Sequence, residues 1–172
     1  MNRIIELLRS AHALLVKGAS QLQSPLLLVV RLYWGWAFFQ TGKGKLMNLD
    51  QTTEFFSGLG IPMPGVNAVM AAATECFGGL LLLLGLASRP AAALLSFTMI
   101  VAYLTADLDA VKGIFSDPDA FLEAAPFQFL FASVLVLVFG PGFFSLDRIL
   151  QWWSDRKQAP RAATPALQAS LR

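Results

Sequence analysis

Two ionisable side chains, Arg31 and Glu75, lie inside apolar stretches that are long enough to cross a lipid bilayer. A charge at that depth costs from about 2.5 to more than 10 kcal/mol, so it normally faces a protein partner or a wet cavity. The two residues therefore predict an intramembrane site that handles protons, a quinone or an anion. The alternative is a buried ion pair that fixes only the orientation and register of two helices.

The depths of Arg31 and Glu75 decide whether they can meet. At about 1.5 Å per residue, Arg31 lies some 9 Å past Pro25, where the first stretch begins. Glu75 lies about 14 Å past Val66, which starts the second stretch from the opposite side. In a hydrocarbon core about 30 Å thick, the two side chains reach similar levels, and an Arg31–Glu75 pair is predicted near the midplane. Small residues that let another helix approach surround Glu75, namely Ala71, Ala72, Gly78 and Gly79.

A second polar set gathers toward the outer ends of every apolar stretch except the one that contains Glu75. Its members are Gln40, Thr41, Lys43, Tyr103, Asp107, Glu123 and Gln128. At their estimated depths they predict a small-molecule pocket that opens to the outer leaflet. The alternative is a set of ordinary interfacial residues, satisfied by head groups and water.

Composition limits the class of protein. The chain has 172 residues, of which 56% are hydrophobic and 14% charged, whereas soluble domains carry about 25% charged residues. Its net charge of +2 comes from basic residues spread along the chain, so nucleic acid is not an expected partner. Cys76 and His12 are its single cysteine and histidine, so no disulfide, metal site or haem site is expected from this chain alone.

The pattern of apolar residues predicts an all-α integral membrane four-helix bundle over residues 25–150. The four expected spans are about 25–41, 66–86, 90–105 and 126–144. Residues 1–24 have helical apolar spacing with basic residues on the other face, which predicts an amphipathic interfacial helix. The loop from residue 42 to 65 is unusually apolar and predicts a short helix over residues 49–57. The polar residues 151–172 predict a disordered cytoplasmic tail.

The distribution of basic residues predicts the topology. With four spans, the N-terminus, the loop that contains Arg89 and the C-terminus share one side, and most Lys and Arg residues lie there. The positive-inside rule then places both termini in the cytoplasm. Ala92 and Ser96 form a pair of small residues that could receive a further helix, so a homo-oligomer is an open alternative.

Four segments carry a family resemblance. They are RLYWGWAFFQTGKGKL from Arg31, FFxGxGIPxP from Phe55, ExxGGLLLLLG from Glu75 and GPGxxSLD from Gly140. In this order and spacing the chain resembles the DoxX family of small bacterial inner-membrane proteins, over about residues 25–148. Many relatives have a histidine just before the Gly-x-x-Lys segment, where this chain has Gln40 and Thr41. The positions that match the family pattern are Arg31, Gly42, Lys43, Glu75, Gly79, Arg89 and Asp147.

The resemblance implies a location in the bacterial cytoplasmic membrane. It also implies an accessory or quinone-interacting subunit of a membrane oxidoreductase or redox-stress system, with a partner membrane or redox protein. A stand-alone enzyme is not expected, because the chain has no paired Cys or His ligands for an electron-carrying cofactor. Electrons would come from a partner or from a bound quinone. The alternatives are a small-solute carrier or permeation helper, and a scaffold or assembly protein for a partner membrane protein.

Overall fold

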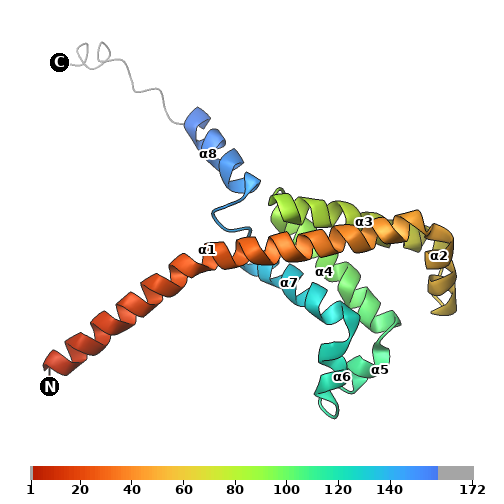
Figure 1. Ribbon diagram of the computed structural model, residues 1–172, viewed down its shortest axis with the longest axis horizontal. Coiled ribbons are helices and arrows are strands. Elements are labelled where there is room, and N and C mark those ends of the chain that lie inside the picture. Colours follow the sequence, from red (N-terminus) through yellow and green to blue (C-terminus); the bar gives the residue numbers. More distant parts are fainter. Residues whose placement is uncertain (1, 159–172) are drawn as a thin grey trace, which may run out of the picture.

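The computed structural model describes residues 2–158, and every regular element in that range is a helix (Figure 1). The elements are α1 (Asn2–Met47), α2 (Leu49–Gly58), α3 (Pro64–Leu84), α4 (Ser88–Thr105), α5 (Leu108–Lys112), α6 (Pro118–Glu123), α7 (Ala125–Phe139) and α8 (Leu146–Gln158). The predicted all-α class is confirmed. By length and composition, α1, α3 and α4 are able to cross a membrane, whereas α7 is apolar but has only 15 residues.

The first helix is longer than the sequence pattern indicates. α1 runs without interruption for 46 residues, or roughly 69 Å, and contains Pro25. The sequence pattern instead predicts three parts here: an interfacial helix, a span that ends at Thr41 and a loop that begins at Gly42. Helical structure continues past Gly42 because this glycine packs directly on α3, and that contact offsets its weak helix propensity.

Glycines set the close approach of α1 and α3, which run antiparallel. A Cβ atom added to Gly35 would lie 2.7 Å from the backbone nitrogen of Leu83, and one added to Gly42 would collide with the backbone of Cys76. On α3, a Cβ atom at Gly79 would lie 2.5 Å from the backbone nitrogen of Phe39. These contacts fix the register, with Gly35 near the end of α3 and Gly42 near its middle.

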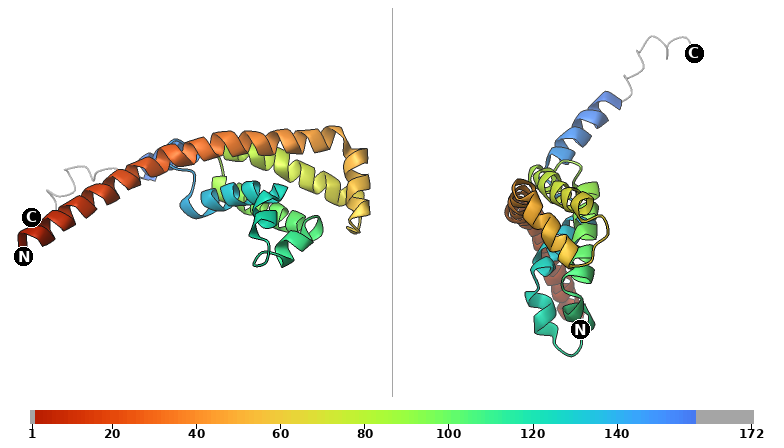
Figure 2. Two further views of the ribbon diagram at one scale, coloured as in Figure 1. Left: turned by 60° about the horizontal axis from the view of Figure 1, so that its bottom comes forward. Right: turned by 90° about the vertical axis from the view of Figure 1, so that its right-hand side faces the viewer.

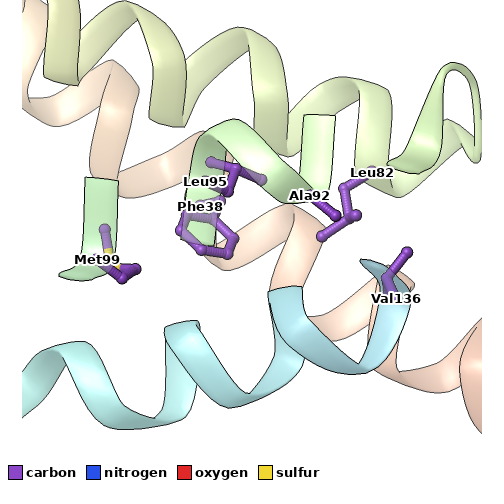
Figure 3. Packing of buried hydrophobic residues seen from close by; sticks show 6 residues of the cluster. All are labelled: Phe38, Leu82, Ala92, Leu95, Met99 and Val136. Atoms are coloured by element: carbon purple, nitrogen blue, oxygen red, sulfur yellow. The ribbon is translucent and has the colours of Figure 1, made fainter. Parts of the chain in front are cut away.

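The core joins α1, α3, α4 and α7. Figure 3 shows its side chains, which are Phe38, Leu82, Ala92, Leu95, Met99 and Val136. Ser96 lies beside this core, and its hydroxyl donates to the Ser133 hydroxyl of α7 at 2.8 Å. The prediction that Ala92 and Ser96 face a further helix outside the bundle is therefore wrong, because α7 of the same chain covers them.

The structure also tests two segments that were predicted outside the four spans. α2 confirms the short helix expected near residues 49–57. Residues 151–158, expected to begin the disordered tail, instead complete α8, whose apolar residues recur at helical spacing. The rest of the predicted tail, 159–172, lies outside the described residues.

Candidate functional site

Glu75 lies midway along α3 and forms an ion pair with Lys45 from the last turn of α1. Lys45 Nζ donates to Glu75 Oε1 at 2.6 Å. The Glu75 side chain is only 3% exposed, whereas that of Lys45 is 38% exposed. The buried Glu75 carboxylate is therefore paired with a lysine that is partly accessible from outside the bundle.

The second carboxylate oxygen of Glu75 has unused capacity. Glu75 Oε2 is buried and has no hydrogen-bond partner among the described residues. Buried carboxylate oxygens normally accept at least one hydrogen bond, so such an oxygen needs an explanation. An ammonium group also offers three donors, and only one of those on Lys45 is used in the interactions described here. Glu75 and Lys45 together can thus accept one hydrogen bond and donate others to a small molecule.

α2 is folded across the end of α1 next to this pair. The Thr52 hydroxyl donates to the carbonyl oxygen of Asn48 at 3.0 Å and lies 3.4 Å from that of Lys45. Thr52 is buried, so these bonds hold the first turn of α2 against the turn that carries Lys45. The corner between α1 and α2 therefore positions the Lys45 side chain toward α3.

Arg31 forms a different polar centre, at the other end of α3. Its guanidinium donates to four backbone carbonyls and is 1% exposed. Nε and Nη2 reach Leu82 and Leu83, at 2.9 and 3.3 Å, in the last turn of α3. Nη1 reaches Pro141 and Phe144, at 2.5 and 2.9 Å, in the loop between α7 and α8. A cation is favourable at this helix C-terminus, where the aligned carbonyls carry partial negative charge.

Asp147 completes the same centre from the start of α8. Its carboxylate accepts hydrogen bonds from the backbone N–H groups of Ala87 and Ser88, at 2.7 and 2.9 Å, where α4 begins. Between the two charged residues, Gly85 has φ +68°, and a Cβ atom there would collide with the Arg31 guanidinium. Arg31 and Asp147 together join the α3–α4 turn to the α7–α8 loop, which is a structural role.

The predicted ion pair between Arg31 and Glu75 is wrong. Because Gly42 faces Cys76, the α1 level that faces Glu75 is about 12 residues from Arg31, or roughly 18 Å. The depth estimate failed because it ended the first span at Thr41 and therefore treated Lys45 as part of a loop. Each residue instead has its own partner, and only Glu75 retains an unsatisfied polar atom.

The predicted outer pocket is not assembled as a unit. Tyr103 is buried, and its hydroxyl donates to the carbonyl oxygen of Phe121 at 2.8 Å. Thr41 donates to carbonyls of its own helix. Asp107 is half-buried, while the other members are exposed: Gln40, Lys43, Glu123 and Gln128. An open groove of about 570 Å³ does lie between α2 and α3, but residues outside this set line it, among them Asp50, Glu54 and Pro64.

Lys45 is the functional candidate that the sequence analysis missed. A usable signal was present, because Arg31, Gly35, Phe38, Gly42 and Lys45 follow one another at intervals of four and three residues. That spacing places all five on one helical face. Extending the series past Thr41 would have placed Lys45 at the end of the face that packs on α3.

Comparison with known proteins identifies relatives of this chain. The sequence model described as DoxX matches residues 26–108. A Bacillus subtilis protein named "Putative oxidoreductase CatD" is 32% identical over 122 residues, which are 70% of this chain and 83% of that protein. The inner membrane protein YphA of Escherichia coli is 32% identical, over 72% of this chain and 89% of YphA. The uncharacterised membrane protein Rv3486 of Mycobacterium tuberculosis is 33% identical, over 73% and 82%. No solved structure matches significantly.

Proposed function

Because the chain belongs to the DoxX family of membrane proteins, we propose that it is an accessory subunit of a membrane oxidoreductase or redox-stress system that binds a quinone at Lys45 and Glu75. The observation that carries this proposal is the buried Glu75 Oε2, which has no partner among the described residues. The name of the B. subtilis relative supports the redox class.

The two side chains suit a quinone head group. A quinone supplies two-electron, two-proton chemistry in the membrane. Its carbonyl oxygens can accept a hydrogen bond from Lys45, and the hydroxyl of its reduced form can donate to Glu75 Oε2. Arg31 has no part in this binding, because all its observed bonds are to backbone carbonyls. Electrons would reach the quinone from a partner protein.

The proposal includes a topology with four membrane crossings. α7 would provide the fourth, short crossing, and both termini would lie in the cytoplasm. This orientation is supported by Arg89, Arg148 and Arg156 at the end of the bundle where α8 begins. The opposite end carries the acidic α5–α6 segment, which includes Asp107, Asp117 and Asp119.

The test is co-purification from native membranes in mild detergent, followed by native mass spectrometry. We expect a bound quinone, or a stoichiometric partner enzyme, with the unaltered chain. Glu75→Gln and Lys45→Met should lose the quinone while the helical content stays unchanged, and Lys43→Met on the exposed face of the same helix should retain it. A chain that carries neither quinone nor partner, and that moves a solute into liposomes, would instead be a carrier.

A further inference from the structure

α8 carries an apolar face that the rest of the described chain leaves uncovered. Leu146, Ile149, Leu150 and Trp153 recur at positions i, i+3, i+4 and i+7, so they share one side of the helix. Their side chains are 38% to 59% exposed, and Trp152 at the border of this face is 50% exposed. An apolar face of this size loses free energy in water and is stabilised by a covering surface.

The start of α8 is fixed at one end of the bundle. Arg31 holds the carbonyls of Pro141 and Phe144 just before α8, and Asp147 in its first turn caps α4. α8 therefore begins level with the α3–α4 turn, where the apolar helices of the bundle end. From this point it extends sideways, away from the other helices (Figures 1 and 2).

Basic residues accompany the aromatic residues of α8. Lys157 follows Trp153 by one helical turn on the same side of α8, and Arg156 beside it lies over the ring of Trp152 at 3.6 Å from its centroid. Arg148 lies 5.9 Å from the ring centroid of Phe143 in the preceding loop. Tryptophan with adjacent arginine or lysine is typical of the head-group level, where the rings meet the acyl boundary and the cations meet phosphate.

We propose that α8 lies flat on an anionic lipid surface at this end of the bundle. Leu146, Ile149, Leu150 and Trp153 enter the acyl boundary, and Arg156 and Lys157 contact lipid phosphates. Charge favours anionic lipid over a second copy of the chain, because the three basic and two acidic side chains of α8 give it a net charge of +1, which an anionic surface attracts and a second α8 repels. Each basic residue near an anionic surface contributes about 1 kcal/mol, equivalent to about fivefold in affinity.

The experiment uses the full chain in nanodiscs with a nitroxide label. Ile149→Cys places the label on the apolar face, and Gln151→Cys places it on the opposite side as a matched control. Native Cys76 is buried at 7% exposure and does not compete for the label. We expect oxygen, which concentrates in lipid, to collide more often with the label at 149, and an aqueous nickel chelate to collide more often with the label at 151.

A change of lipid composition then tests whether the basic residues of α8 contribute to its binding. The contrast between positions 149 and 151 should be larger in nanodiscs that contain phosphatidylglycerol than in phosphatidylcholine alone. Combining Arg156→Gln and Lys157→Gln should remove this preference, because each substitution should lower the affinity of α8 for the anionic surface by about fivefold. Lys112→Gln at the other end of the bundle should leave the preference unchanged. Equal access of the nickel chelate to both positions would overturn the proposal. So would a position 149 shielded from both reagents, which would indicate a protein partner.

Discussion

Replacing Arg31 by methionine should destabilise the protein without altering the Glu75 site. Methionine fills much of the same volume but donates no hydrogen bond. It therefore removes the side-chain donor that now serves the carbonyls of Leu82, Leu83, Pro141 and Phe144. The end of α3 and the loop before α8 would lose the side chain that joins them.

The size of the effect follows from the four bonds. Side-chain hydrogen bonds in a membrane protein contribute about 0.6 kcal/mol each on average, which gives about 2.4 kcal/mol for Arg31. Bonds that involve a charged group reach about 1.5 kcal/mol or more each, which gives about 6 kcal/mol. Methionine also avoids the cost of burying a guanidinium, so we expect a loss of about 2 to 4 kcal/mol in the free energy of unfolding.

The assay is reversible unfolding by SDS in mixed micelles, followed by far-ultraviolet circular dichroism. Lys43→Met is the matched control, because Lys43 is exposed on the same helix, and it should change the free energy of unfolding by less than about 0.5 kcal/mol. Arg31→Lys should recover only part of the loss, since an ammonium group cannot reach carbonyls on both sides as a planar guanidinium does.

A double-mutant cycle supplies the result that would refute this reasoning. Residues separated by more than about 10 Å with no shared partner are additive within about 0.5 kcal/mol. Arg31→Met and Glu75→Gln should therefore be additive. Coupling above about 1 kcal/mol between them, or a cost for Arg31→Met no larger than for Lys43→Met, would show that the guanidinium does not hold the backbone as described.

Three further outcomes are expected in the same unfolding assay. Lys45→Met and Glu75→Gln should show a coupling energy of about 0.5 to 3 kcal/mol, because the two side chains are in direct contact; full additivity would argue against the ion pair. Gly42→Ala should cost about 1 to 3 kcal/mol through overpacking against α3, whereas Gly44→Ala, with open space around it, should be neutral or stabilising by up to about 1 kcal/mol; equal effects would contradict the register. Asp147→Ala should cost about 0.5 to 2 kcal/mol and speed hydrogen exchange at the amides it caps, and unchanged exchange there would contradict the cap.

The helical fold could be predicted from the apolar pattern of the sequence. The polar contacts could not, because they depend on where each helix ends. The all-α class was predictable because long apolar runs leave the backbone few alternatives in lipid. The end of α1 was not, because glycine and lysine beyond Thr41 are typical of a loop, and only packing of Gly42 on α3 keeps that segment helical. An error of a few residues at this boundary moved Lys45 out of the bundle and led to the wrong partner for Glu75.

Arg31 was correctly predicted to be buried, but its actual partners could not be deduced from residue types. Four backbone carbonyls satisfy it, and backbone carbonyls are present at every position of a sequence. Their availability depends on the end of α3 and on the path of the α7–α8 loop. These are tertiary features, and local sequence patterns do not specify them.

α1 is fastened to the rest of the bundle at two points that lie 14 residues apart on one rigid helix, about 21 Å along its axis. A slide of α1 by a single turn would break the bonds of Arg31 and of Lys45 at the same moment, and the glycine contacts between them would become collisions. Sliding or piston motion of α1 is therefore blocked. We expect access to Glu75 to open through displacement of α2, which packs on α3 and is bonded to the end of α1 through Thr52. A crosslink that immobilises α2 should then slow the exchange of the proposed quinone at Glu75. A crosslink between α1 and α3 should not slow it.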